Sequence, residues 1–262
     1  MWDAIRAEHV KLWSTRSTWY TLLGAAVVGV GIPVVVAWYA VRLWDGHPPA
    51  IRSHLTVTPL APFAAWLAAL ALAVLGVLTM TSEHATGLIG TSLAAVPRRP
   101  WLFAAKAIAV GVFALTAGEA IVFTAFLLTR WIVGDRPIPF LTYRFPQEIH
   151  VLLSLGLGVM VFALVGLGAG ALLRGATPVI VVVVVGCGYA LPLIALHPPA
   201  PWNDRLAAVL LPKLAGQLSG SPQLTAVAHP LLSPPEALVV MAAYLAAAVG
   251  GGVAARTRRD AA

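Results

Sequence analysis

The sequence predicts an all-α polytopic membrane protein with six transmembrane helices and an amphipathic interfacial helix at its N-terminus. Of its 262 residues, 60% are hydrophobic and only 10% are charged, whereas a soluble domain carries about a quarter charged residues. The mean hydropathy is +0.87, and the apolar residues gather in runs of about 20, the length a helix needs to cross a bilayer. Because lipid offers the backbone no hydrogen-bond partners and the runs lack strand-like alternation, each run is expected to be helical.

Residues 1–17 are predicted to form the interfacial helix. At 100° per residue, one side of the helical wheel carries apolar and aromatic residues: Trp2, Ile5, His9, Leu12 and Trp13. The other side carries Asp3, Glu8, Lys11, Ser14 and Thr15, and Arg16 violates the stripe. The alternative is a basic anchor that only fixes orientation.

Six nearly uncharged stretches are expected to span the membrane: residues 17–41, 55–82, 102–129, 151–173, 177–196 and 237–255. The first is too long for the apolar region of a signal peptide, about 7–15 residues, so we expect it to be retained. No internal repeat or separate soluble domain is visible, and residues 1–262 are expected to form one transmembrane domain. Gly166 and Gly170 form a G-x-x-x-G face in the fourth span, which predicts close helix packing.

Two connections have distinct sequences. The link from span four to span five is very short, with Gly175 suited to a helix C-terminus, Thr177 to an N-cap and Pro178 to a first turn. It predicts a tight hairpin. Residues 197–236 form a long, proline-rich outer loop. Within it, a short amphipathic helix is expected, broken near Pro212, with an apolar stripe of Leu206, Leu210, Leu214 and Leu218.

The distribution of Lys and Arg predicts that both termini are cytoplasmic. Six crossings put the termini on one side, and the segments on that side carry ten basic residues in 53, against seven in 74 on the other. The formal net charge of +7 is therefore attributed to orientation and partner contact, and nucleic acid is not needed to explain it.

The segment between spans two and three is not a plain polar connector. Residues 82–99 read Ser-Glu-His-Ala-Thr-Gly-Leu-Ile-Gly-Thr-Ser-Leu-Ala-Ala-Val-Pro-Arg-Arg. The set Leu88, Ile89 and Leu93 indicates a short helix whose apolar ridge faces something other than lipid. The alternative is a ridge that packs back on the ends of its own spans.

This segment, followed by Ala105 and Lys106, resembles the loop between spans two and three in ABC-2-type transporter permeases of bacteria. Residues 7–12 and 16–19 also resemble the N-terminal interfacial helix of that family. The resemblance implies six spans in the bacterial plasma membrane, cytoplasmic termini, and a second permease subunit, identical or homologous. It also implies a coupling helix that docks on a separate cytoplasmic ATP-binding subunit, which holds ATP and Mg²⁺.

The resemblance places six residues at or near the ATPase contact: Glu83, Gly87, Ile89, Leu93, Arg98 and Arg99. Two positions depart from the family pattern, which has an aromatic residue in place of His84 and often a basic residue in place of Gly90. Both departures bear on the strength of the ATPase contact.

Glu119 is the only acidic residue deep inside an expected span. Such carboxyl groups are costly in lipid and usually face a bundle interior or a polar path, so Glu119 is a candidate for the transport path. The alternative is a structural carboxyl, protonated or hydrogen-bonded to Thr116 one turn back. Lys106, near the inner end of the same span, is expected to extend its amine to the interface.

The sequence lacks the motifs of the common catalytic classes. A Walker A loop needs Gly-Lys-Ser/Thr, but the three lysines follow Val10, Ala105 and Pro212. Neither His-Glu-x-x-His nor Gly-x-Ser-x-Gly occurs, and Cys187 is the only cysteine. We therefore expect no enzyme activity, metal site or cofactor on this chain.

The leading hypothesis is the membrane subunit of an ATP-driven exporter of a small or amphipathic compound. The second is an ion-coupled secondary transporter that uses Glu119 as its proton carrier. The third is a membrane scaffold or immunity protein without a transport cycle.

Overall fold

The structure is a computed structural model that describes residues 2–52, 57–86, 99–139, 141, 145–173, 175–220 and 232–258. Over these residues it is helical and contains no strand. Six helical segments are long and apolar enough to cross a membrane: Arg16–Gly46, Leu60–Ser82, Trp101–Val133, Glu148–Leu172, Ala176–Ile194 and Pro234–Ala254. The predicted fold class, an all-α protein that crosses the membrane six times, is confirmed.

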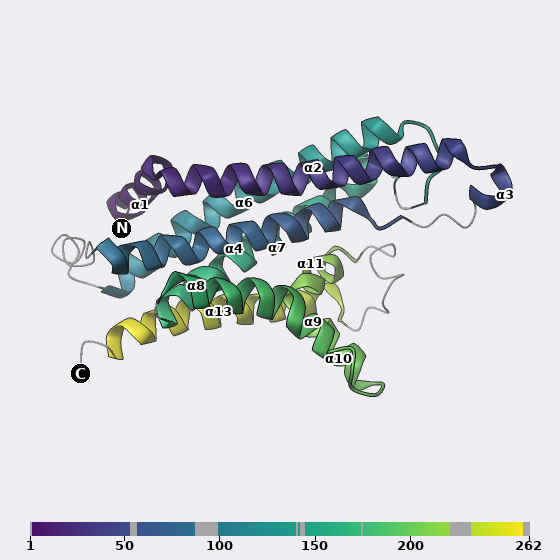
Figure 1. Cartoon of the computed structure of the whole chain (residues 1–262). Helices are drawn as coiled ribbons and strands as arrows, with labels where there is room; N and C mark the ends of the chain where they lie inside the picture. The colour runs from purple at the N-terminus through teal and green to yellow at the C-terminus, as the bar shows by residue number, and fades with distance from the viewer. Residues whose placement is uncertain are drawn as a thin grey trace.

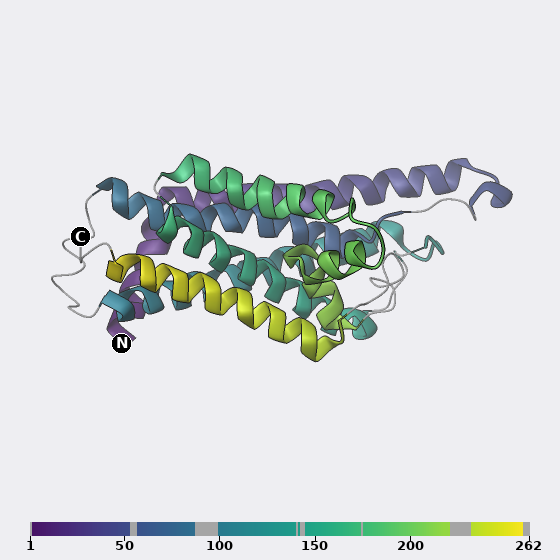
Figure 2. The same cartoon turned by 90° about the horizontal axis from the view of Figure 1, so that it is seen from below.

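The spanning segments belong to a bundle with two distinct ends (Figure 1). The helices are α1 (Trp2–Ser14), α2 (Arg16–Gly46), α3 (Pro49–Arg52), α4 (Leu60–Thr86), α6 (Arg99–Val133), α7 (Phe145–Leu172), α8 (Ala176–Ile180), η1 (Val181–Ala190), α9 (Leu191–Ile194), α10 (Trp202–Val209), α11 (Leu211–Ser219) and α13 (Pro234–Arg258). One end, here called the base, holds α1, the end of α4, the start of α6 and the end of α13 (Figures 1 and 2). The far end holds α3, α10 and α11.

Helices α4 and α7 form the centre of the bundle. In the 18-residue apolar stretch that defines each span, 61% and 78% of the residues of α4 and α7 are buried, against 22% in the first and sixth spans and 17% in the fifth. Close approach explains the glycines here, because a Cβ on Gly76 would lie 2.0 Å from the Ala163 carbonyl oxygen. A Cβ on Gly166 would likewise lie 2.3 Å from the carbonyl oxygen of Ala73. The close packing predicted from the glycine face of span four is confirmed at the α4–α7 contact.

The first span is longer than predicted, because α2 continues through Gly46. Its 31 residues extend about 46 Å at 1.5 Å per residue, more than the roughly 30 Å of a bilayer core. The extra turns carry charged side chains that have partners: the Arg42 guanidinium lies 4.1 Å from the centre of the Trp38 ring. Asp45 accepts two hydrogen bonds from Arg136, of 2.9 and 3.0 Å.

The fifth span is not a uniform α-helix. It runs from α8 through η1, a π-helix of ten residues, into α9. The N–H of Leu191 bonds the Gly186 carbonyl, five residues back, and the next residue, Pro192, has no N–H to donate. At its start, Gly175 rather than the expected Thr177 occupies the N-cap, with φ +93°, a value that favours glycine.

At the far end, the outer segment contains two short helices rather than one. Leu210 is extended between α10 and α11, and Pro212 lies in the first turn of α11, where a missing N–H costs no helical hydrogen bond. Helix α11 packs into the bundle rather than on its surface, since Leu214 is fully buried and the Ala215 Cβ fills the space beside Gly158. The break in this segment therefore lies at Leu210, slightly before the predicted position.

Candidate functional site

Helix α1 is attached to the bundle through a buried ion pair. Glu8 accepts a hydrogen bond from the Lys106 ammonium of α6, and the two residues are only 6% and 3% exposed. Each charge offsets the cost of burying the other. One expectation is corrected here: Lys106 does not extend its amine to the interface but is buried against Glu8.

The orientation of α1 follows from this pair. Glu8 and Leu12 are its buried residues, whereas Trp2 is 83% exposed and Trp13 is 46% exposed. The Trp2 ring thus points away from the core, where tryptophan rings would meet the membrane interface. This arrangement fits a helix that lies in the interface and is attached to the bundle through Glu8 and Leu12.

Aromatic contacts fix the turn from α1 into α2. The Trp13 ring packs edge-on against Trp19 and Phe113, with ring centres 5.1 and 5.8 Å apart. The Trp19 indole N–H also donates to the Trp13 carbonyl over 2.9 Å. Because Phe113 belongs to α6, these rings give α1 a second attachment to the same helix that carries Lys106.

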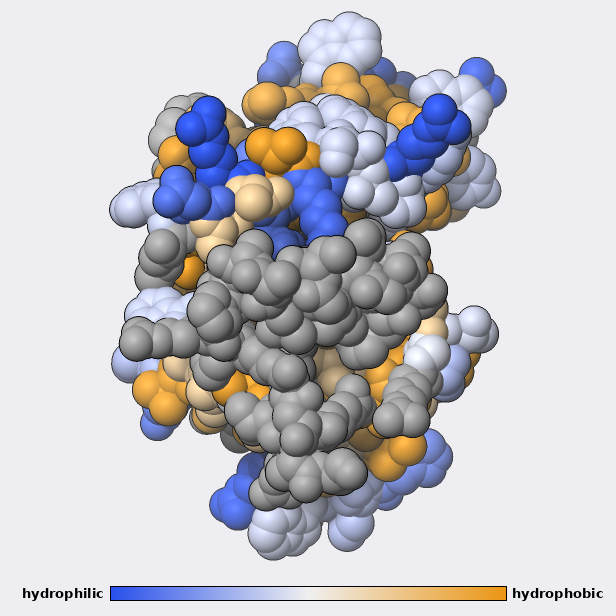
Figure 3. All heavy atoms as spheres, turned by 90° about the vertical axis from the view of Figure 1, so that its left-hand side faces the viewer, coloured by the Kyte–Doolittle hydropathy of each residue, from blue (hydrophilic) through white to orange (hydrophobic). Residues whose placement is uncertain are grey.

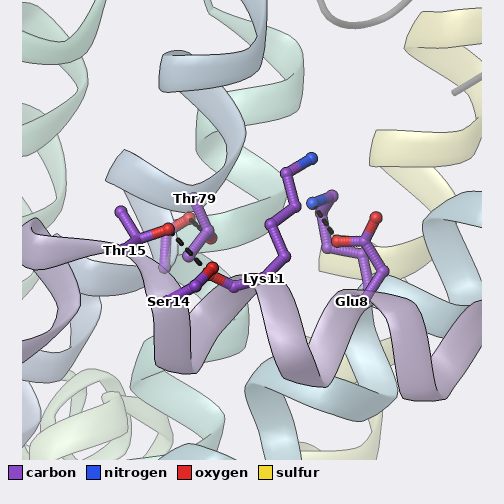
Figure 4. A network of polar contacts seen from close by, with 7 residues as sticks. Glu8, Lys11, Ser14, Thr15 and Thr79 are labelled. Atoms are coloured by element: carbon purple, nitrogen blue, oxygen red, sulfur yellow. Dashed lines mark hydrogen bonds and ion pairs between the residues drawn. The ribbon is translucent and has the colours of Figure 1, made fainter. Parts of the chain in front are cut away.

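Between α1, α2, α4 and α6 lies a groove, here called the base groove, and Figure 4 shows several of its polar residues. It leaves room of about 40 Å³, enough for a few water molecules. Its lining combines polar residues with three leucines: Glu8, Lys11, Leu12, Thr15, Ser17, Thr18, Thr21, Leu75, Leu78, Thr79, Ser82 and Lys106. Seen from the base, hydrophilic atoms gather in the upper part of the molecule, on the side where α1 lies (Figure 3).

The hydroxyl groups of the base groove are turned toward nearby carbonyls. Thr15 donates to the carbonyl of Lys11 over 2.7 Å, and Thr79 donates to that of Gly76 over 2.8 Å. Ser14, beside the groove, donates to the same Lys11 carbonyl over 3.0 Å (Figure 4). As a result, Thr15 stands at the N-cap of α2 without capping it by its side chain.

The predicted ATPase-contact residues lie at the base as far as the structure describes them. Glu83 is in the last turn of α4, and Arg99 is the first residue of α6. Gly87, Ile89, Leu93 and Arg98 lie outside the described residues, as does Gly90, and only the backbone is described at Glu83, His84 and Arg99. The described ends of this segment thus flank the base groove, which Ser82 and Lys106 line.

Glu119 lies in α6 at the seam with α7. Its side chain is partly exposed, but its Oε2 atom is buried without a hydrogen-bond partner among the described residues. A Cβ on Gly156 would lie 2.3 Å from the carboxyl carbon, so the carboxyl group occupies the space that this glycine leaves. Thr116 donates instead to the carbonyls of Val112 and Phe113, over 3.0 Å each. The alternative pairing of Glu119 with Thr116 is therefore wrong.

No cluster of three or more His, Cys, Asp or Glu side chains that could hold a metal is found in the part of the chain that the structure describes. Sequence patterns missed the Glu8–Lys106 pair and the base groove. The signal that could have revealed the pair was an acid and a lysine expected at the same depth, one in the interfacial helix and one near the inner end of the third span.

A comparison with protein-family models finds no match to this chain, and a comparison with curated protein sequences finds none either.

Proposed function

We propose that this chain is the membrane-spanning permease subunit of an ATP-binding-cassette transporter of the bacterial plasma membrane. It exports a small or amphipathic compound, works with a second permease subunit, and draws energy from a separate cytoplasmic ATPase. The resemblance of residues 82–106 and 7–19 to ABC-2-type permeases supports this proposal, together with the six spans.

One structural observation carries the proposal furthest. The two stretches that bear the resemblance are distant in sequence, yet they meet at the base through the buried Glu8–Lys106 pair and across the base groove. The end of α4 and the start of α6, between which the proposed coupling segment lies in the sequence, are thus close to α1, the helix that would move with them. This is the arrangement expected if force from a partner enters at the base.

The path of that force follows from the packing. ATP binding closes the ATPase dimer and displaces the segment from Glu83 to Arg99, which continues directly into α4 and α6. Helix α4 transmits the motion to α7 along their close contact at Gly76 and Gly166. Helix α1 follows α6 because Lys106 and Phe113 hold it. The spans then change the side of the membrane to which the path opens.

A pull-down experiment tests the assigned partner and its contact. The full-length chain is co-expressed with its cognate ATPase subunit, and the pair is recovered in detergent. Joint replacement of Ile89 and Leu93 by Ala and of Arg98 by Gln should abolish recovery of the ATPase. The matched control is Asp45→Asn with Arg136→Gln at the far end, which should leave recovery unchanged. If the triple variant still recovers the ATPase, the assignment of the contact to these residues is wrong.

A second function is favoured by one observation: the buried Oε2 of Glu119 has no partner among the described residues. An acid in that position could carry a proton through the cycle of an ion-coupled secondary transporter. Proteoliposomes separate the two functions. Transport without ATP that is lost in Glu119→Gln supports the secondary transporter, whereas strictly ATP-dependent transport that survives this substitution supports the permease.

A further inference from the structure

A second groove, here called the side groove, lies between α1 and α6 and shares no lining residue with the base groove. It encloses about 530 Å³, the size of a pocket for a drug-sized molecule. Its lining carries no formal charge when His9 is neutral: Trp2, Ile5, His9, Ile108, Ala109 and Val112. Ile108 and Val112 are 40% and 52% exposed within the third span, so the side groove borders the lipid. It therefore suits the apolar part of a molecule that enters from the membrane.

The same face of α6 leads from the side groove to Glu119. At 100° per residue, Ile108, Val112 and Glu119 lie within about 40° of one another around the helix. Glu119 lies two turns beyond Val112, about 10 Å farther along α6, in the middle of the span. Thr116, between them, is also exposed on the surface of α6. One face of a single helix thus joins an apolar groove to a carboxyl group.

The oxygens along this face can accept hydrogen bonds. The Glu119 Oε2 atom is buried and accepts none from any described residue. The Glu119 side chain is partly exposed, so the carboxyl group can also be reached from outside the bundle. The Thr116 hydroxyl donates to the Val112 and Phe113 carbonyls, which leaves its oxygen able to accept.

An organic ammonium group satisfies these oxygens best. A carboxylate inside a membrane span is costly unless a positive charge accompanies it, and an ammonium brings that charge together with N–H donors. The described residues form no group of three His, Cys, Asp or Glu side chains, so a single carboxyl group offers a metal ion few of the oxygen ligands that a hard cation takes. The side groove, two turns away, accommodates an apolar body attached to the ammonium.

We propose that the side groove and Glu119 together bind an amphipathic organic amine. The apolar body lies in the side groove, and the ammonium group donates to the Glu119 carboxylate, with the Thr116 oxygen as a further acceptor. Because the carboxylate and the apolar surface are about 10 Å apart along α6, the site selects molecules that carry a charge and an apolar body at this separation. That the amine is the transported compound rests on the proposed function, whereas its binding requires only this chain.

Energy transfer from tryptophan to a pyrene probe measures this binding. The purified full-length protein in maltoside micelles is titrated with 1-pyrenebutylamine and, separately, with 1-pyrenebutanol, which has nearly the same shape but no charge. The wild-type protein should bind the amine more tightly. Glu119→Gln should weaken amine binding about tenfold, because a charge pair is lost, and should leave alcohol binding unchanged. Glu119→Asp keeps the charge and should retain the preference for the amine; a complete loss of preference in this variant would count against the carboxylate.

Variants of the side groove and of two positions outside it complete the test. Val112→Phe fills the groove and should weaken the binding of both probes. Asp3→Asn removes an acid from α1, and Leu127→Phe adds a ring at an exposed position of α6; both should bind as the wild-type protein does. Equal binding of the two probes by the wild-type protein would mean that any apolar chain, such as a lipid tail, occupies the groove, and would overturn the proposal. An equal loss in Glu119→Gln and Asp3→Asn, or unchanged binding in Val112→Phe, would overturn it too.

Failure of this site and failure of the proposed function give different results. If the ATPase is recovered in the pull-down but the wild-type protein shows no preference for the amine, the permease stands and the substrate class is wrong. If the preference for the amine depends on Glu119 but no ATPase is recovered, the site stands and the proposed function is wrong. Because Glu119→Gln lowers only the affinity, ATP-dependent transport at saturating amine should survive it.

Discussion

Two glutamates within the helical bundle have opposite surroundings. Glu8, at the base, is buried against Lys106 of another helix. Glu119, in the middle of the third span, fills the space beside Gly156, and its buried oxygen has no hydrogen-bond partner among the described residues. The first carboxylate is fixed by a charge that also needs a partner. The second has space beside Gly156, and its Oε2 atom accepts no hydrogen bond within the part of the chain that the structure describes. The neighbouring helix therefore decides whether an acid in a membrane bundle is held by a counter-charge or keeps the freedom to change its protonation.

The largest effect is expected from breaking the pair at the base. Lys106→Met leaves the Glu8 carboxylate buried without its counter-charge, which typically costs about 3–5 kcal/mol. We expect a corresponding loss in the free energy of unfolding, measured in detergent with a chemical denaturant. The double variant Glu8→Gln with Lys106→Met removes both charges and should recover much of the loss. A single variant as stable as the wild-type protein would show that the pair contributes nothing.

The next effect tests the space around Glu119. Gly156→Ala places a Cβ 2.3 Å from the carboxyl group and should destabilise the α6–α7 contact by about 1–3 kcal/mol, as overpacking commonly does. Gly186→Ala, where a Cβ would meet nothing within 4 Å, is the control and should be neutral. Adding Glu119→Ala to Gly156→Ala should restore stability; no recovery would mean that the strain arises elsewhere.

A smaller effect is expected when the Glu119 carboxyl group loses its ability to ionise. Glu119→Gln keeps the shape, and the carboxyl group has no ion-pair partner among the described residues to lose, so the free energy of unfolding should change by less than about 1 kcal/mol. Thermal unfolding in detergent, run beside Lys106→Met, measures the contrast directly. A loss as large as that of Lys106→Met would contradict the view that Glu119 is not held structurally.

The smallest effect is expected at the far end, where an ion pair is exposed. The Asp45 carboxylate raises the pKa of Arg136 by accepting its hydrogen bonds, yet the two side chains are 52% and 38% exposed. Water and salt screen such pairs, so Asp45→Asn should leave the unfolding temperature unchanged within error. A measurable drop that disappears in high salt would show that this pair does more than exposed pairs usually do.

Sequence patterns predicted some residues of the candidate site and missed others, and the physical reason differs from residue to residue. Glu119 could be singled out because an acid within an apolar membrane span is costly, and this holds for a single helix whatever packs against it. The burial of Glu8 could not, because a helical wheel shows which residues share a face but not which face another helix will cover. The ATPase contact at Glu83, Gly87, Ile89, Leu93, Arg98 and Arg99 rests on the resemblance and stays a prediction.

The sequence alone determined the fold class and the number of spans. Both follow from local physics, because an apolar run of sufficient length must cross the lipid as a helix that satisfies its own backbone. Only the tertiary structure decided that α4 and α7 form the centre, that α1 turns Glu8 inward, and that Gly156 lies against Glu119. These features depend on which helices meet at a given depth, and that is fixed by packing between residues far apart in the chain.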